Sequence, residues 1–371
     1  MKASDIVVVG AGVVGCAIAY ELARRGASVE VVDDRAPGMG ATQASAGVLA
    51  PFIEGRENSP LLDLATRSLE LFDDFVAAAS NDSGVAVPYR RSGTLDVALH
   101  DDGIRRLRVM ADLLARRGVA AELVDGPAAR AEEPHLADDI AGALLIPTQG
   151  FVAAGELTRA LVTAARRHGA QVIESGRVRK IARRGGDVAI ETARGALTGN
   201  SVVLAAGCWS ALIEIDGVAE RVPVRPVRGQ LLHLAWQGGH IRRVTWSERC
   251  YVVPWDDGTV LVGATVEEAG FDERATVAGV RDLLESACEL CPHAWTAGFL
   301  GARVGLRPAT ADDLPIIGAS QAMPNLMYAT GHYRNGVLLA PLTAHLVADA
   351  ILANRIDPAL EKLAPGRFGR L

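Results

Sequence analysis

The chain has 371 residues, enough for two domains around a large core. Apolar residues make up 49% of the sequence and charged residues 22%, which is ordinary for a soluble globular protein. The formal net charge of −6 argues against a general nucleic-acid-binding role.

No segment of the sequence reads as a membrane span. The apolar N-terminal run can be mistaken for a signal peptide, but three patterned glycines interrupt it and the charged residues Glu21, Arg24 and Arg25 follow. Cleavage as an export signal would also delete the glycine motif described next. We therefore expect a cytoplasmic protein without a transmembrane segment.

A glycine-rich turn near the N-terminus has a complete structural context. The pattern G-x-G-x-x-G at residues 10–15 follows an apolar strand over 5–9 and opens a helix over 13–25. A second apolar strand over 28–32 ends at Asp33, where an acid can accept hydrogen bonds from a ribose. The glycines allow a tight turn and a close approach to a pyrophosphate, and the helix N-terminus attracts phosphate. We therefore expect an ADP-containing cofactor, either NAD or FAD, rather than a ligand-free turn.

Small residues fill the next segment, 38–51, where an NAD-binding sheet would usually continue with another helix and strand. Their side chains leave room for the backbone to run beside an extended ligand. In chain order, the patterning then predicts a helix over 60–79, a strand over 93–99, helices over 102–117 and 155–168, and strands over 171–174, 187–191 and 201–205. The last strand ends in a small-residue turn at Gly207, a second place for close approach to the cofactor.

The C-terminal part of the chain predicts a further set of elements. They are a strand over 229–234, a hairpin of strands 251–255 and 259–263 around Asp256-Asp257-Gly258, a helix over 277–290 and a final helix over 341–353. We predict an α/β fold, α+β overall, with two interleaved domains. A Rossmann-type cofactor-binding domain would comprise residues 1–83, 151–220 and 301–371, and a mixed or antiparallel-sheet substrate-binding domain residues 84–150 and 221–300. This interleaving disfavours a simple NAD dehydrogenase.

Two of the five cysteines have the spacing of redox or zinc sites, at Cys288 and Cys291. The amphipathic helix over 277–290 runs into this pair, so small apolar cysteines at a helix end are the favoured interpretation. A zinc site normally needs two more ligands, and only His293 lies nearby in the sequence. We expect no bound metal.

Two runs near the C-terminus carry the second informative pattern. Arg307 lies between Leu306 and Pro308, and a guanidinium in an apolar stretch needs an anionic partner, either a substrate or a structural ion pair. The run at 331–341 offers glycines and backbone N–H groups directly before a helix. Such N–H groups can donate hydrogen bonds to a carbonyl oxygen of a ligand ring, where negative charge develops during a reaction.

On these residues the sequence resembles the FAD-dependent amine and D-amino-acid oxidase superfamily, and most closely the bacterial glycine oxidases of thiamine biosynthesis. The resemblance covers essentially the whole chain. Many flavoproteins share the N-terminal fingerprint. The loop that ends at Ala50-Pro51 is more specific, because fewer flavoproteins share it. The more specific runs are Cys250-Tyr251-Val252-Val253-Pro254, Val262-Gly263-Ala264-Thr265, Gly305-Leu306-Arg307-Pro308 and Gly331-His332-Tyr333-Arg334-Asn335-Gly336.

This resemblance implies a role for each matching residue. Arg307 would bind the substrate carboxylate, Tyr251 would add a hydroxyl hydrogen bond to it, and Arg334 would flank substrate and flavin. Val178 would hold the adenine end of FAD through its backbone. The FAD would be non-covalent, because residues 305–341 contain no cysteine. With the fingerprint glycines, the implied cofactor-binding set is Gly10, Gly12, Val13, Val14, Gly15, Asp33, Asp34, Ala41, Thr42, Ala46, Gly47, Val48, Val178, Gly207, His332, Tyr333, Arg334, Asn335, Gly336, Val337 and Leu338.

The sequence departs from the family's pattern in several places, one of which is Trp255, at a position that is often basic. Val266 stands where relatives can carry a methionine over the substrate, which puts the substrate preference in question. Some relatives use a lysine to assist oxygen reduction, whereas the only lysines here are Lys2, Lys180 and Lys362. That role must fall elsewhere, and His332 is one candidate.

The activity that the resemblance implies is oxidative deamination of glycine, with sarcosine and small D-amino acids as further substrates. Hydride would pass from Cα to flavin N5, the imine would hydrolyse to the 2-oxo acid and ammonia, and O2 would take the electrons to give H2O2. Two alternatives remain open: a D-amino-acid dehydrogenase that passes electrons to a quinone or protein, and a flavin-binding subunit without chemistry of its own. A homo-oligomer and a functional link to thiazole synthesis are both compatible with the resemblance.

Overall fold

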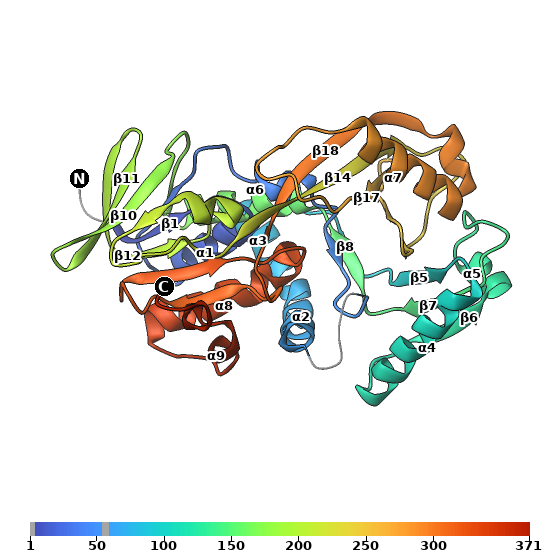
Figure 1. The fold of residues 1–371 in the computed structure, drawn as a ribbon, viewed down its shortest axis with the longest axis horizontal. Helices are drawn as coiled ribbons and strands as arrows, with labels where there is room; N and C mark the ends of the chain where they lie inside the picture. The colour runs from blue at the N-terminus through green and yellow to red at the C-terminus, as the bar shows by residue number, and fades with distance from the viewer. Residues whose placement is uncertain (1–3, 54–58) are drawn as a thin grey trace.

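The computed structural model describes residues 4–53 and 59–371, and it has the α/β architecture expected from the sequence. Two large sheets lie side by side along the longest axis, with helices packed around them (Figure 1). A small sheet of β3 (Val48–Leu49), β8 (Gly150–Val152) and β4 (Tyr89–Arg90) lies where the two halves meet.

The first sheet is built around β1 (Ser4–Val9), which pairs in parallel with β2 (Val29–Val32) and β12 (Gly195–Leu204). Its other strands are β9 (Gln171–Ile173), β10 (Val178–Arg184), β11 (Asp187–Thr192), β13 (Glu214–Ile215), β19 (Ile316–Ala319) and β20 (Leu326–Thr330). Apolar clusters cover both faces of β1, which explains its unbroken run of apolar residues.

Helices cover one face of this first sheet. They are α1 (Val13–Arg24), α2 (Pro60–Glu70), α3 (Phe72–Ser83), α6 (Ala154–Arg167) and α8 (Gly336–Ala353), and they share one core cluster with β1 and β2. Two short elements follow at the C-terminus, the helix α9 (Ala359–Leu363) and the 3-10 turn η4 (Pro365–Phe368). The N-terminal turn of α1 and the start of α8 thereby lie at the same edge of the sheet.

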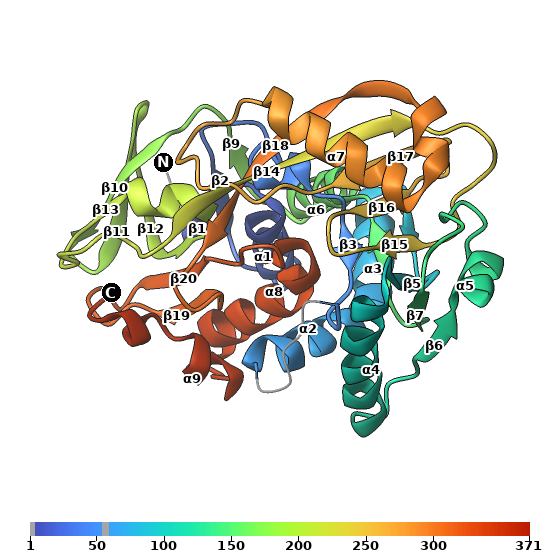
Figure 2. The same ribbon diagram turned by 45° about the vertical axis from the view of Figure 1, so that its right-hand side comes forward.

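The second sheet has the strand order β18-β14-β17-β16-β15-β5-β7-β6. Its strands are β5 (Thr94–Ala98), β6 (Glu122–Asp125), β7 (Gly142–Ile146), β14 (Arg225–Ala235), β15 (Val244–Trp246), β16 (Tyr251–Pro254), β17 (Thr259–Gly263) and β18 (Gly298–Ala309). The helix α7 (Val277–Leu290) packs across β14 and β17 (Figure 2), followed by η3 (Pro292–Thr296). The helices α4 (Asp101–Arg116) and α5 (Gly126–Glu132) pack beside β5, β6 and β7.

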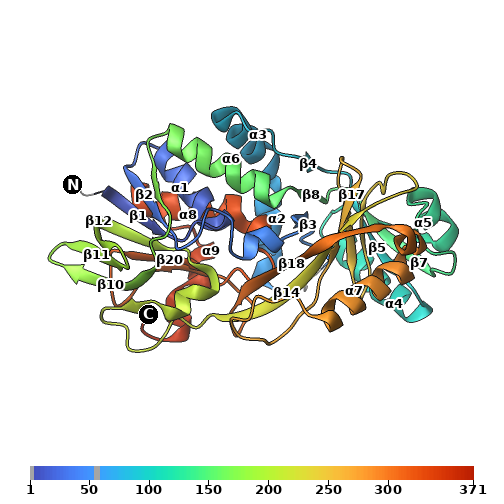
Figure 3. The ribbon, with the colours of Figure 1, turned by 90° about the horizontal axis from the view of Figure 1, so that it is seen from above.

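Two long strands connect the halves of the molecule. β14 and β18 pair along their whole lengths, from Arg225 opposite Ala309 to Ala235 opposite Gly298. Seen from above, they run from the first sheet into the second (Figure 3). The predicted domain boundary at residue 301 falls within β18, and the interleaved domain boundaries remain a prediction.

Most elements lie where the sequence predicts them, with two corrections. The hairpin around Asp256-Asp257-Gly258 forms, with Tyr251 opposite Gly263. The single helix predicted over 60–79 is instead two helices that meet at Leu71. The final helix begins at Gly336 rather than Pro341, so a proline lies inside it. Next to this proline, the N–H of Leu342 donates to Ser68 Oγ at 3.3 Å.

In the described residues, α8 is long and apolar enough to cross a membrane by length and composition, although 61% of it is buried inside the protein. The helix belongs to the core cluster of the first sheet, as expected of a central helix in a globular domain. The cysteine pair lies at the end of α7, where Cys291 is buried and Cys288 is half-buried, and both thiols are free. This agrees with apolar cysteines at a helix end.

The third fingerprint glycine sets the distance between α1 and the sheet. A Cβ on Gly15 would overlap the carbonyl oxygen of Gly10, a backbone atom that cannot move cheaply. We expect Gly15→Ala to destabilise the protein by about 1–3 kcal/mol through overpacking, as measured by urea unfolding. The matched control is Gly155→Ala in α6, where a Cβ would have no heavy atom within 4 Å. Equal stability of the two variants would contradict the packing argument.

Candidate active site

A cavity of about 930 Å³ lies between the two sheets and takes its lining from both. This volume is near the upper end of the roughly 300–1,000 Å³ typical of ligand sites. The first sheet contributes the glycine turn, the acid after β2 and the turn before α8, whereas the second sheet contributes Tyr251 and Arg307. The cavity therefore brings together residues from both ends of the described chain, from Val9 to Leu338.

The glycine turn forms one end of the cavity. Gly10 has φ of +108°, and a Cβ there would overlap the carbonyl oxygen of Ala205 at the end of β12. The first turn of an α-helix leaves N–H groups without intrahelical acceptors. At α1, the N–H of Val13 donates to Thr42 Oγ1 at 3.1 Å, while Val13 and Val14 both line the cavity. This geometry suits an anionic group such as a pyrophosphate.

Asp33 supports the same turn and lines the cavity beside it. Its Oδ2 accepts the N–H of Ala11 at 2.6 Å and its Oδ1 accepts the N–H of Arg35 at 2.9 Å. Burial raises the pKa of Asp33, and these two N–H donors act in the opposite direction. The carboxyl is thus fixed at the position that the fingerprint assigns to a ribose-binding acid.

The small-residue segment forms one wall of the cavity, as predicted. It contains the 3-10 turn η1 (Ala41–Ala44) and the short strand β3. Gly47 has φ of +68°, and a Cβ there would overlap the carbonyl oxygen of Val152, so the backbone just before β3 lies directly against β8. On the other side, a Cβ on Gly305 would lie 2.9 Å from the Cβ of Ala44. Small residues therefore allow β18 to lie directly against this wall.

Strand register brings Tyr251 and Arg307 to one face of the second sheet. Arg307 on β18 lies opposite Val227 on β14, and Tyr251 on β16 lies opposite Gly263 on β17. Residues that face each other across antiparallel strands point to the same side, and so do alternate residues of one strand. The side chains reach across glycines, because a Cβ on Gly229 would overlap the guanidinium of Arg307 and one on Gly263 would overlap the phenol of Tyr251.

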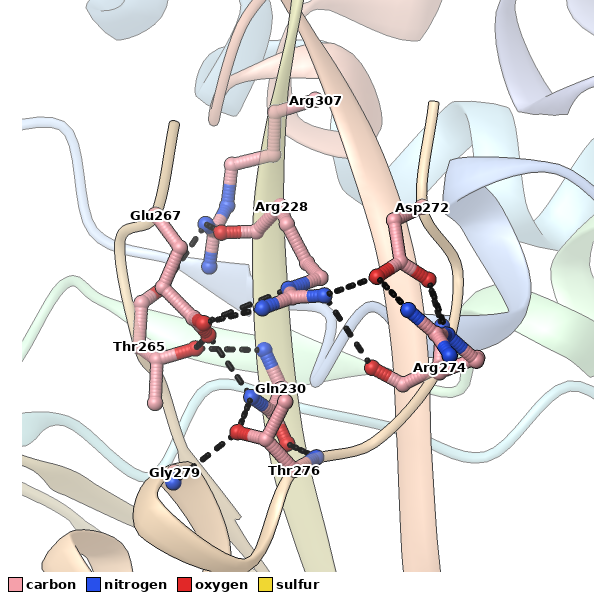
Figure 4. A network of polar contacts seen from close by, with 9 residues as sticks. All are labelled: Arg228, Gln230, Thr265, Glu267, Asp272, Arg274, Thr276, Gly279 and Arg307. Atoms are coloured by element: carbon pink, nitrogen blue, oxygen red, sulfur yellow. Dashed lines mark hydrogen bonds and ion pairs between the residues drawn. The ribbon is translucent and has the colours of Figure 1, made fainter. Parts of the chain in front are cut away.

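Backbone carbonyls hold the guanidinium of Arg307. Its Nη1 donates to the carbonyl oxygen of Thr265 at 2.9 Å and, more weakly, to that of Arg228 at 3.4 Å (Figure 4). The ring of Tyr251 is likewise supported, since its centroid lies 4.8 Å from that of Trp246 on the adjacent strand. Both polar side chains are half-buried and line the cavity.

The turn between β20 and α8 faces these residues from the first sheet. Tyr333 has a left-handed φ of +47°, and its N–H donates to the carbonyl oxygen of Pro308 at 2.9 Å, directly beside Arg307. Left-handed φ is uncommon for a non-glycine residue and often marks functional sites. Arg334 is exposed, lies 5.3 Å over the ring of Tyr333 and lines the cavity.

His332 lies in the same turn, with only 4% of its surface exposed. Its Nε2 lies 3.1 Å from Thr343 Oγ1, and burial lowers its pKa to about 4. The imidazole is therefore neutral near neutral pH. The role of His332 in oxygen reduction, in place of a lysine, stays a prediction. Lys180 and Lys362 do not line the cavity, and Lys2 lies outside the described residues.

The structure brings the sequence-predicted site residues together, with one exception. Every residue of the sets given above lines the cavity except Gly15, whose place is the contact between α1 and the sheet. Sequence reasoning missed Arg35, Trp209 and Phe271, which also line the cavity. Arg35 directly follows the predicted Asp34 and Trp209 lies two residues after the predicted Gly207, so both could have been inferred from that, whereas nothing in the sequence indicated Phe271.

These three residues take part in contacts between the first sheet and the second at the edge of the cavity. Arg35 pairs through both nitrogens with Glu273, at 2.8 and 2.6 Å, and lies 4.7 Å over the ring of Trp209. Phe271 approaches the same ring, with centroids 6.3 Å apart. Glu273 and Phe271 belong to the 264–276 loop, which joins β17 to α7. This loop therefore reaches from the second sheet to the nucleotide-binding end of the first.

Comparison with known proteins decides between the cofactors that the fingerprint leaves open. The sequence matches the family described as DAO, FAD dependent oxidoreductase, over residues 5–350. The chain belongs to this family. It is an FAD-binding oxidoreductase, and the NAD alternative is thereby set aside.

The similar proteins include several with named activities. Glycine oxidase of Geobacillus kaustophilus is 33% identical over 370 residues, covering 97% of this chain and 95% of the relative. The crystal structure of glycine oxidase from G. kaustophilus superposes with a TM-score of 0.94 at 32% identity and covers 99% of both chains. The structure of iminodiacetate oxidase from Chelativorans sp. BNC1 has a TM-score of 0.89 at 28% identity, covering 97% and 98% of the two chains.

One relative is a larger protein. The bifunctional protein ThiO/ThiG of Nostoc sp. is 34% identical over 364 residues, which are 96% of this chain but 54% of that protein. The chain therefore spans about half the length of this relative.

The cavity residues of this FAD-dependent oxidoreductase fit the cofactor. The glycine turn and the start of α1 suit the pyrophosphate, and Asp33 suits the ribose. The turn at 331–338 lies against β18, where its N–H groups and the start of α8 suit a ring with polar edges. At Gly10 and Gly47 the cavity wall is backbone packed so closely against backbone that a Cβ would not fit. Walls without side chains allow an extended ligand to lie close to the backbone.

The Arg35–Glu273 pair should help this oxidoreductase to retain FAD. We expect Glu273→Gln to raise the Kd for FAD about three- to tenfold, because a bidentate, partly exposed pair that joins the two cavity walls contributes about 1 kcal/mol. Flavin fluorescence during titration of the apoprotein measures this Kd. The matched control is Glu285→Gln on α7, where Glu285 pairs with exposed Arg281. A Kd for FAD equal to that of the control would show that the pair does not retain the cofactor.

Proposed function

We propose that this protein oxidises glycine or another small amino acid or amine in an FAD-dependent reaction. The observation that carries the proposal is that Arg307 and Tyr251 lie on the same face of the second sheet, opposite the turn at 331–338. A guanidinium beside a phenol hydroxyl suits a carboxylate. The relatives named glycine oxidase and iminodiacetate oxidase support a small amino-acid substrate.

The residues of the chain would act mainly by positioning the substrate. Arg307 and Tyr251 would bind the carboxylate and so direct the Cα–H bond of the substrate towards the turn at 331–338, whose residues would hold the flavin ring. The bound FAD supplies the redox chemistry and accepts the two electrons of the oxidation. Arg334 flanks the substrate at the mouth of the cavity. Fixing the substrate in this way converts the oxidation into an effectively intramolecular step.

No side chain needs to act as a base if the amine enters the cavity in its neutral form. His332 is neutral, hydrogen-bonded to Thr343 and buried, so it holds the turn rather than exchanging protons. The products would be the imine, which hydrolyses in water to the 2-oxo acid and ammonia. Glycine would give glyoxylate.

The electron acceptor that we propose is O2, with H2O2 as product, which is supported by the oxidase names of the relatives. The alternative is a dehydrogenase that passes electrons to a quinone or a protein. Peroxide formation in air without any added acceptor separates the two. The name ThiO/ThiG supports a link to thiamine biosynthesis, and we place the reaction in the cytoplasm.

The central test is a substrate panel of glycine, sarcosine, D-alanine, D-proline and iminodiacetate. Anaerobic bleaching of the flavin at 450 nm reports oxidation of each amine, and peroxide release in air reports the acceptor. We expect the wild-type holoenzyme to oxidise glycine, and Arg307→Ala to lower kcat/KM by about 10- to 150-fold, since a charged hydrogen bond to the substrate contributes about 1.5–3 kcal/mol. Undiminished turnover in Arg307→Ala would refute the proposed carboxylate site.

A second variant displaces Arg307 without removing it. Gly229→Ala places a methyl group where the guanidinium lies, and the end of a flexible side chain can move aside at little cost in stability. We therefore expect a KM for glycine raised about tenfold with an unchanged Kd for FAD and an unchanged melting temperature. The control is Gly186→Ala in a surface turn, where a Cβ would have nothing within 4 Å. If Gly229→Ala mainly lowers the melting temperature, Gly229 serves packing instead.

A further inference from the structure

A second group of polar residues lies behind the carboxylate site, on the other face of β14. Arg228 and Gln230 alternate along this strand with Val227 and Gly229, so they point away from the face that carries Arg307. Their partners are Thr265 and Glu267 at the start of the 264–276 loop (Figure 4). We call Arg228, Gln230, Thr265 and Glu267 the Glu267 network.

Glu267 is the hub of this network. Its Oε1 accepts hydrogen bonds from Thr265 Oγ1 at 2.6 Å and from Gln230 Nε2 at 2.7 Å. Its Oε2 accepts from Arg228 Nη2 at 2.6 Å. Burial by itself would raise the pKa of Glu267, but these three donors outweigh it, so the pKa lies below its ordinary value. The carboxylate is therefore ionised throughout the neutral pH range.

The backbone of the loop is fixed by the same residues. The N–H of Arg228 donates to the carbonyl oxygen of Glu267 at 2.9 Å, and the N–H of Glu267 donates back to that of Arg228 at 3.0 Å. The N–H of Gln230 donates to Thr265 Oγ1 at 2.9 Å, and the N–H of Thr265 donates to the carbonyl oxygen of Gln230 at 3.2 Å. Thr265 is thus held through its hydroxyl as well as through its peptide group.

This matters because the carbonyl oxygens of Thr265 and Arg228 are acceptors for Arg307 Nη1. Both carbonyls belong to residues of the Glu267 network. The side chain of Arg228 is 8% exposed and that of its partner Glu267 is 27% exposed, so the ion pair is partly buried rather than a fully exposed surface contact. A buried group with all its partners in place has one defined geometry, and it passes that geometry to whatever it binds.

We propose that Glu267 is a positioning residue for the substrate carboxylate, acting through Thr265 and Arg228 on Arg307. This inference rests on the proposed function, because it assigns Arg307 to the carboxylate. Glu267 itself does not contact the substrate, since it belongs to the opposite face of the sheet. It sets the place of two carbonyl oxygens, and these set the orientation in which Arg307 meets the carboxylate.

The experiment measures carboxylate binding in the holoenzyme, separately from turnover. Glycolate lacks the amine that is oxidised, and its Kd follows from the perturbation of the flavin absorbance spectrum on titration. We expect Glu267→Ala to raise this Kd about tenfold and Glu267→Gln, which keeps one acceptor oxygen and the side-chain shape, to raise it less than threefold. With glycine as substrate, the KM should rise in parallel while kcat changes less than twofold.

A second pair of variants avoids removing the partner of buried Arg228. Thr265→Val deletes the hydroxyl that joins Glu267 to the backbone of Gln230 but keeps the side-chain volume and the Arg228–Glu267 pair. We expect it to raise the Kd for glycolate about fivefold, and Thr265→Ser to restore near wild-type binding. This pair keeps the test valid if Glu267→Ala fails to fold. The matched control is Glu268→Gln, because Glu268 is the next residue of the loop and pairs with exposed Arg225.

The outcomes separate this inference from the proposed function. If Arg307→Ala weakens glycolate binding while Thr265→Val and the foldable Glu267 variants bind as tightly as Glu268→Gln, the positioning role is refuted and the carboxylate site stands. If Arg307→Ala binds glycolate as the wild type does, the carboxylate site and the positioning role both fail. A loss of FAD affinity in Thr265→Val equal to its loss of glycolate affinity would show a general structural role and would also overturn the inference.

Discussion

The antiparallel pairing of β14 with β18 is the constraint on which the site depends. β18 carries Arg307, and β14 passes beneath it with a glycine at the one position where the guanidinium crosses. A shift of one residue in this pairing would turn Arg307 to the opposite face, away from Tyr251 and the cavity. If β18 kept its place instead, the shift would turn β14 over and bring Arg228 and Gln230 to the cavity side. Strand register, set over the whole length of two long strands, thus decides which polar residues meet the substrate.

The two faces of β14 divide the electrostatics of the site. On the cavity side the strand presents Val227 and Gly229, which have no polar side chain and leave space for Arg307. On the far side it presents Arg228, whose charge is balanced by Glu267 and by Asp272 at 3.1 Å. Removing one partner of a buried ion pair is far more costly than the pair itself is stabilising. The charges behind the sheet are therefore interdependent, whereas the face towards the ligand stays open.

The sequence predicted those parts of the fold and site that depend on neighbouring residues. The fingerprint at 10–15, the hairpin around Asp256-Asp257-Gly258 and the helix α7 each have local turn or periodicity signals, and all three are confirmed. The strand β18 had no such signal, because its three glycines and one proline disfavour a strand. It forms because β14 supplies its partner. Likewise, Glu267 looks like a surface acid beside Glu268, and only the contact with Arg228, 39 residues away, shows its buried partners.

The interleaved chain has a consequence for how the protein is assembled. The cavity is lined by residues from Val9 to Leu338, so a fragment that holds the fingerprint alone lacks much of the binding site. The complete site exists only in the docked state, in which the two sheets are packed against each other. A ligand that binds only the docked state adds its binding free energy to the stability of that state. Bound FAD would therefore stabilise the contact between the two sheets as well as supply the redox chemistry.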